Sequence, residues 1–85
     1  NRNMEIYFSD SAYRQIYKLE KTHQKRIFEK LEFFASQDNP LNFAEKLSEP
    51  FGQWRFRVGE YRVIFDASKD KITILKVGNR KDIYK

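Results

Sequence analysis

The sequence predicts one α+β domain over residues 1–85, with two helices packed on one face of an antiparallel sheet. Apolar residues recur at helical spacing in the first half of the chain, and alternating strand-like segments fill the second half. A Gly59-Glu60 pair between two of those segments indicates a tight hairpin turn. The expected order is an N-terminal strand, a two-helix hairpin and a three-stranded antiparallel meander.

The first strand and the first helix are predicted from a short stretch near the N-terminus. Residues 4–8 alternate apolar and mixed side chains, which indicates a strand. Ser9 and Asp10 offer side-chain oxygens that can cap a helix. Apolar residues at helical spacing then predict a helix over about residues 10–19.

A second helix is expected from about Thr22, as its cap, to about Ser36. Its apolar residues form a stripe, with Phe33 beside it and partly exposed. The stripe consists of Ile27, Phe28, Leu31, Phe34 and Ala35. Asp38-Asn39-Pro40 stops the helix, because the residue before a proline avoids helical geometry. The sequence leaves open whether the two helices are separate or one bent helix.

The central hairpin is predicted over Trp54–Phe65, with a type II′ turn at residues 59–60. This register places Arg57 opposite Arg62. Side chains alternate between the faces of a strand, so the apolar residues share one face, which we predict to be the core side. They are Trp54, Phe56, Val58, Tyr61, Val63 and Phe65. Arg55, Arg57 and Arg62 then share the opposite face.

A last strand is predicted over Lys71–Val77 and is expected to end at Gly78. Simple alternation places Ile72, Ile74 and Lys76 on one face, and Thr73, Leu75 and Val77 on the other. Apolar residues on both faces predict a central strand. A short basic tail, Asn79–Lys85, follows it.

The net positive charge of the chain comes entirely from residues 50–85. Residues 1–49 carry 8 basic and 8 acidic side chains, whereas residues 50–85 carry 9 basic and 4 acidic ones, which accounts for the net charge of +5. Arg57 opposite Arg62 is destabilising unless something offsets the repulsion, and an anion held between them would do so. The pattern favours an anionic partner, with nucleic acid first, over a basic surface that serves only solubility.

Several kinds of chemistry are excluded by composition. The chain has no cysteine and a single histidine, His23, so we predict no metal site and no cofactor. His23 lies near a helix start between lysines and is predicted to be a surface residue. The glycines are isolated and form no phosphate-binding loop. No stretch resembles a signal peptide or a membrane span, so we expect a soluble, cytoplasmic protein with no membrane partner.

Phosphate chemistry on RNA is the reaction class that remains. The planar fork of arginine matches phosphate oxygens, so Arg55, Arg57 and Arg62 can grip a nucleic-acid backbone. Arg80 follows the neighbouring strand and can complete the group, while Tyr84 can stack on a base. Arginines aimed at a scissile phosphate would stabilise charge in the transition state. The RNA 2′-hydroxyl would supply the nucleophile.

At these residues the chain resembles the RelE family of toxins from bacterial and archaeal toxin–antitoxin systems. WRFRVGEYRVIFD (Trp54–Asp66) and ITILKVGNRKDIYK (Ile72–Lys85) carry the resemblance, and KRIFEKLEFFA (Lys25–Ala35) resembles the second helix of the family. The resemblance implies an α+β fold with a curved antiparallel sheet. It also implies an endoribonuclease that enters the ribosomal A site, cleaves the mRNA by 2′-hydroxyl attack and arrests translation. A cognate, RelB-like antitoxin that wraps the toxin and blocks its basic site is also implied. From charge complementarity we predict that acidic residues of this antitoxin approach the arginines.

The resemblance also assigns roles to individual residues. Arg62, Arg80 and Tyr84 match residues of the family, and Arg55 and Arg57 fall where relatives carry basic residues. We predict that the catalytic residues are Arg57, Arg62, Arg80 and Tyr84, and that the RNA- or phosphate-binding residues are Arg55, Lys76, Lys81 and Lys85. Many relatives carry histidine where this chain has Asn79, so no side chain with a pKa near neutral remains in the predicted site. Tyr84 is then the candidate for proton transfer.

Two other functions fit the same pattern. The related ParE branch shares the fold, and its members inhibit DNA gyrase without cleaving RNA. An RNA-binding module without turnover would carry the same arginines. Cellular read-outs separate the nuclease from the gyrase inhibitor, because translation arrest indicates the nuclease whereas DNA damage and filamentation indicate the gyrase inhibitor.

Overall fold

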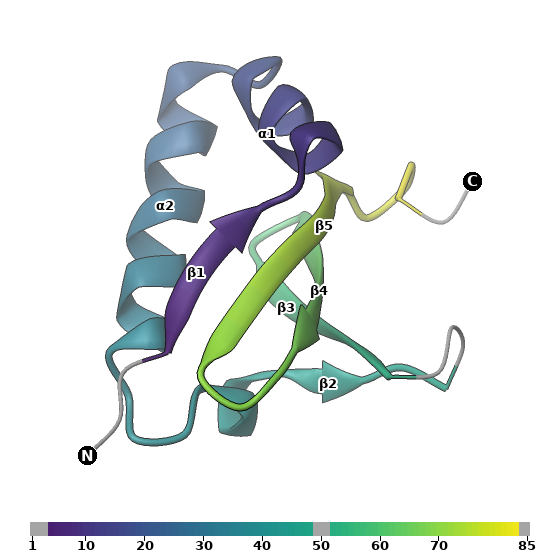
Figure 1. Cartoon of the computed structure of the whole chain (residues 1–85). Helices are drawn as coiled ribbons and strands as arrows, with labels where there is room; N and C mark the ends of the chain where they lie inside the picture. The colour runs from purple at the N-terminus through teal and green to yellow at the C-terminus, as the bar shows by residue number, and fades with distance from the viewer. Residues whose placement is uncertain (1–3, 49–51, 84–85) are drawn as a thin grey trace.

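The computed structural model describes residues 4–48 and 52–83 and confirms the α+β class (Figure 1). Two helices lie on one side of a five-stranded sheet. The elements in chain order are β1 (Glu5–Phe8), α1 (Asp10–Tyr17), α2 (Lys21–Ala35), the 3₁₀ helix η1 (Pro40–Phe43), β2 (Glu45–Lys46), β3 (Gln53–Val58), β4 (Tyr61–Ala67) and β5 (Lys71–Asn79). The predicted Tyr84 and Lys85 lie outside the described residues.

The sheet has the strand order β1-β5-β4-β3-β2 and is mixed rather than fully antiparallel. β3, β4 and β5 form the predicted antiparallel meander, but β1 pairs with β5 in parallel. Parallel neighbours need a crossover, and the two helices provide the start of that crossover between the first and last strands. β2, which pairs with β3, was not predicted because two polar residues show no alternation.

The two helices are separate, and their starts differ in how they are capped. The Ser9 hydroxyl accepts a hydrogen bond from the backbone N–H of Ala12 at 3.0 Å, as predicted for the start of α1. The predicted cap by Thr22 is wrong: α2 begins at Lys21, and its N-cap is Glu20, which lies two residues before Thr22 and makes no side-chain cap bond. Helix α1 ends at Tyr17 rather than near residue 19.

An aromatic stack joins the helix layer to the sheet. The rings of Phe34 (α2), Phe56 (β3) and Phe65 (β4) follow one another with centroids 4.4 Å apart at each step. Around them the core contains Ala12 and other buried residues of both helices and of β3, β4 and β5. Phe33 remains 48% exposed, as expected for a residue beside the apolar stripe.

The register of the central hairpin is confirmed pair by pair, with Arg57 opposite Arg62 and Val58 opposite Tyr61. Gly59 has φ of +60°, and no non-glycine residue among those described has a positive φ, as a type II′ turn requires. The six apolar residues predicted for the core side belong to the core or pack against it. The arginines therefore lie on the face turned away from the helices.

The alternation predicted for the last strand is wrong beyond Ile74, because β5 contains a bulge. Ile64 pairs with Lys76, but the next residue, Phe65, pairs with Ile74, so Leu75 is an extra residue in β5. The bulge reverses the side-chain parity: Val77 joins the core, and Lys76 lies on the face of the arginines. β5 also continues through Gly78 to Asn79 instead of ending at the glycine.

Candidate functional site: an arginine face on the sheet

The candidate site is the sheet surface that carries Arg55, Arg57, Arg62 and Lys76, here called the arginine face. Its residues lie in two cross-strand rows. One row runs from Glu45 (β2) through Arg55 and Ile64 to Lys76, and the other contains Arg57, Arg62 and Gly78. The three arginines predicted from sequence, two on β3 and one on β4, are thus neighbours on one surface, and the bulge in β5 adds Lys76 to them.

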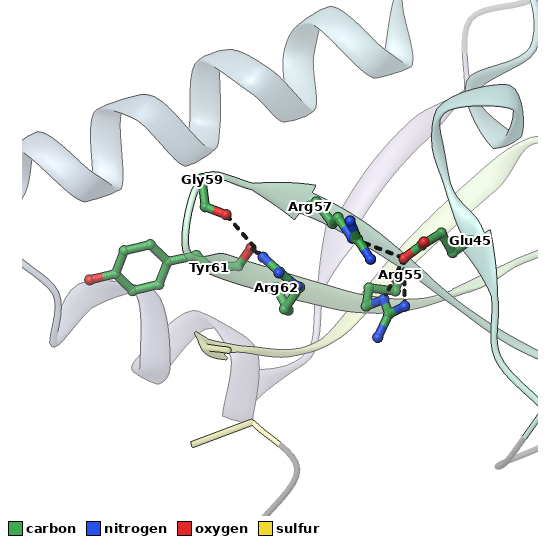
Figure 2. A network of polar contacts seen from close by, with 6 residues as sticks. All are labelled: Glu45, Arg55, Arg57, Gly59, Tyr61 and Arg62. Carbon is green, nitrogen blue, oxygen red and sulfur yellow. Dashed lines mark hydrogen bonds and ion pairs between the residues drawn. The ribbon is translucent and has the colours of Figure 1, made fainter. Parts of the chain in front are cut away.

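Glu45 joins two of the arginines (Figure 2). Its carboxylate oxygen Oε1 accepts hydrogen bonds from Nε of Arg55 at 2.8 Å and from Nε of Arg57 at 3.2 Å. The Arg55 side chain is 21% exposed and that of Arg57 60%. Arg55 is therefore held against the sheet by the carboxylate, whereas Arg57 keeps much of its guanidinium in solvent.

Arg62 points away from Arg57 and back toward the hairpin turn (Figure 2). Its Nη1 donates to the carbonyl oxygens of Gly59 at 3.0 Å and Tyr61 at 3.1 Å. The guanidinium of Arg57 thus binds a carboxylate, and that of Arg62 binds two backbone carbonyls. The repulsion that suggested a bound anion is offset within the chain, so the Arg57–Arg62 pairing by itself no longer requires one.

The segment after β5 brings Arg80 to the same hairpin turn. The backbone N–H of Arg80 donates to the carbonyl of Glu60 at 2.7 Å. Ile83 is buried and anchors the following turn against Gly78. Arg80 and Lys81 both have exposed side chains. The backbone of Arg80 therefore lies at the hairpin turn, and the grouping of its side chain with the arginine face stays a prediction.

Two residues of α2 reach the hairpin turn and were not included in the predicted site. Nη1 of Arg26 lies 3.3 Å from the position that a Cβ on Gly59 would take, and the ring of His23 lies 5.0 Å from that of Tyr61. His23 is thus more than a plain surface residue. Its spacing of three from Arg26 places both on one side of the helix, which was the available signal.

The arginines control the titration of the carboxylate between them. The hydrogen bond from Arg55 lowers the pKa of Glu45 from its ordinary value of 4.5, and partial desolvation opposes this. The charges of Arg55 and Arg57 lower the pKa further. Glu45 is therefore ionised at neutral pH, as a hydrogen-bond acceptor for two guanidinium groups must be.

Other site chemistries find no support in the described part of the chain. Residues 4–48 and 52–83 contain no group of three or more His, Cys, Asp or Glu side chains able to hold a metal ion. Within the same ranges, no helix is both long and apolar enough to span a membrane. The chemistry open to this surface is that of guanidinium, ammonium and carboxylate groups.

Comparison with known proteins shows which family model and which solved structures match this chain. The model of the ParE toxin of type II toxin–antitoxin systems matches residues 6–84. The RelBE2 toxin–antitoxin complex of Mycobacterium tuberculosis contains a chain that is 25% identical, with a TM-score of 0.78 and 95% of each chain covered. A search of curated proteins gives no match.

Two further solved structures share the fold. In the archaeal RelE–RelB complex of Pyrococcus horikoshii, the matching chain is 22% identical, with a TM-score of 0.72, covering 94% of this chain and 98% of the other. In the chromosomal ParDE system of P. aeruginosa, the matching chain is 13% identical, with a TM-score of 0.73, covering 93% of this chain and 98% of the other. Structures described as RelE and as ParDE are thus both similar to this chain.

Proposed function

This chain belongs to the ParE toxin family of type II toxin–antitoxin systems. We propose, from the surface that carries its arginines, that it is a ribosome-dependent endoribonuclease that cleaves mRNA and arrests translation. The observation that carries the proposal is the arginine face, where Arg55, Arg57, Arg62 and Lys76 share one surface. A row of cations on a sheet fits the phosphate backbone of single-stranded RNA. The 25% identical relative from a RelBE complex adds support.

The proposed reaction is an attack of the RNA on its own backbone. The 2′-oxygen forms a bond to the adjacent phosphorus, and the bond from phosphorus to the 5′-oxygen of the next nucleotide breaks, which leaves a 2′,3′-cyclic phosphate. Negative charge grows on the phosphoryl oxygens in the transition state. Arg62 and Arg57 would stabilise it, with Arg80 completing the group beside the hairpin turn.

The 2′-hydroxyl must lose a proton, and we assign Glu45 as the acceptor. Its carboxylate lies between Arg55 and Arg57 and is ionised at neutral pH. While both guanidinium groups bind it, the carboxylate is a weak base. A phosphate that draws them away would raise its basicity at the moment the proton is transferred.

Protonation of the leaving 5′-oxygen needs a second group. We assign this role to Tyr84, the tyrosine implied by the resemblance, which lies in the same C-terminal segment as Arg80. Lys81 and Lys85 would add charge for RNA binding along that segment. The roles of Arg55 and Lys76 on this account are to hold flanking phosphates.

The proposed partners are a cognate antitoxin, the ribosome and mRNA. Solved complexes of relatives pair RelE chains with RelB antitoxins. We infer that acidic residues of a RelB-like antitoxin approach the arginine face, because complementary charge speeds association and fixes register. Substitution of Arg57 and Arg62 should then weaken the complex. An unchanged affinity would indicate steric exclusion from the ribosome instead.

Inhibition of DNA gyrase is the second candidate function. The description of the matching family model, the ParE toxin, favours it, and the fold is also shared with a ParDE system. On this reading the arginine face would contact a protein surface, and no RNA would be cut.

The substitution Arg62→Ala tests the proposal. We expect it to abolish ribosome-dependent mRNA cleavage, because Arg62 lies between Arg57 and Gly78 in one row of the arginine face and its positive charge would stabilise the transition state. Arg14→Ala removes the same charge from the exposed surface of α1 and is the matched control, which should cleave like wild type. Equal cleavage by both variants would remove the site assignment.

A further inference from the structure

A cavity of about 280 Å³ lies beside the outer edge of β5, between α1 and the turn after β5. It exists because β1 pairs only with residues 71–74 of β5, which leaves the edge of the later residues to other groups. Side chains of α1 and of the C-terminal turn line it together with β5. Its volume is slightly below the roughly 300 Å³ at which pockets for drug-sized ligands begin, so it suits a single base.

Gln15 presents a directed donor to this cavity. The backbone N–H of Val77 donates to Oε1 of Gln15 at 2.7 Å, which fixes the orientation of the amide, because only its oxygen can accept. The Nε2 group of Gln15 then has two N–H donors, and no described residue accepts a hydrogen bond from them. Half-buried Gln15 lines the cavity, so these donors are available to a ligand there.

The other walls match the face and edge of a base. Ile83 is 5% exposed and packs on Gly78, with its Cδ1 3.4 Å from the position that a Cβ on Gly78 would take. Asp82 also lines the cavity and carries a carboxylate that can accept a ring N–H. Lys76 places a cation at the same cavity.

The cavity is contiguous with the arginine face. Gly78, which lines it, is the register partner of Arg62 on the neighbouring strand, and Lys76 belongs to both surfaces. Neighbouring strands are about 4.8 Å apart, so a base in the cavity and a phosphate at Arg62 fit one nucleotide or two successive ones.

We propose that this cavity binds the base of an RNA nucleotide whose phosphate lies at Arg62, and that it prefers guanine to adenine. The Nε2 donor of Gln15 pairs with O6 of guanine, and the Asp82 carboxylate accepts from its N1–H. Adenine presents an amino donor in place of O6, which leaves the Gln15 donor unmatched. The inference rests on the proposed RNA-cleaving function and adds a base preference to it.

Titration of the isotope-labelled full chain with guanosine, inosine and adenosine 3′-monophosphates, followed by NMR, tests the inference. The side-chain amide of Gln15 and the backbone amide of Gly78 should shift with the guanosine and inosine compounds. These should bind about tenfold more tightly than the adenosine compound, as expected for one well-placed hydrogen-bonding edge. Inosine retains O6 and N1–H without the 2-amino group, so it isolates the proposed contact.

Gln15→Glu is the informative variant, because it keeps an oxygen for the N–H of Val77 but loses the Nε2 donor. We expect it to keep the fold and lose the preference, whereas Gln37→Glu, the same change elsewhere, keeps the preference. Equal affinity for the guanosine and adenosine compounds, no shift at Gln15, or a preference retained in Gln15→Glu would each overturn the base site. Failure of the nuclease proposal shows separately, as absence of ribosome-dependent cleavage by wild type.

Discussion

Removal of the Phe56 ring is expected to destabilise the domain more than any surface change of the same kind. Phe56 is 0% exposed and lies between Phe34 of α2 and Phe65 of β4, with both ring centroids 4.4 Å away. Its neighbours in sequence, Arg55 and Arg57, point to the opposite face of β3. The ring therefore holds in place the strand that presents two of the site's arginines.

The magnitude follows from this packing. Phe→Ala in a core costs about 3–5 kcal/mol, and the two ring contacts, worth about 0.5–1.5 kcal/mol each, favour the upper part of the range. At roughly 0.05–0.15 kcal/mol per residue, 85 residues give a free energy of unfolding of roughly 4–13 kcal/mol. Phe56→Ala thus removes a large share of the stability and should lower Tm by on the order of 12–40 °C.

Thermal and urea unfolding, followed by far-UV circular dichroism, measure the effect. Phe33→Ala is the matched control, because Phe33 is 48% exposed and should lose only about 1 kcal/mol or less. A difference below about 1 kcal/mol between the two variants would refute the reasoning, since the stack would then not anchor β3.

Three further substitutions test the site. Arg80→Ala should slow mRNA cleavage by about 10²-fold with Tm unchanged, because the contact that places this segment comes from the backbone N–H; a fully active variant would remove Arg80 from the site. Glu45→Gln should make stability less sensitive to acid. The pKa of Glu45 is lowered in the folded chain, so its contribution is present above the ordinary value of 4.5 and is lost as pH falls through the folded pKa; identical pH–Tm curves would contradict this. Gly59→Ala should destabilise the hairpin by about 1–2 kcal/mol, because φ of Gly59 is +60° and the added Cβ would lie 3.3 Å from Nη1 of Arg26. A urea unfolding midpoint equal to that of the wild type would refute this.

Local signals predicted the central part of the fold. The turn glycine and strict alternation determined the hairpin register through Arg57–Arg62, because both act within a few residues along the chain. The bulge at Leu75 changes parity without any residue that marks it, so the predicted face of Lys76 was wrong. The parallel pairing of β1 with β5 joins residues more than sixty positions apart, which periodicity cannot reveal.

The site was predictable where charge and alternation coincided. Arg55, Arg57 and Arg62 share a face as expected, because alternation alone decides it. Glu45 was missed because it lies in a connection without periodicity, ten residues before Arg55, and only the pairing of β2 with β3 brings it there. Arg26 was missed because its helix was interpreted only through its apolar stripe. Glu45 and Arg26 join the site only through contacts between separate strands and helices, which a local sequence pattern does not reveal.

Primer extension on an mRNA in a reconstituted translation reaction, with and without ribosomes, tests the central claim most directly. The account predicts cuts inside codons that appear only when both the protein and ribosomes are present. Uncut mRNA and continuing translation, together with inhibition of DNA gyrase by the same preparation, would contradict the nuclease and assign the chain the gyrase-directed function.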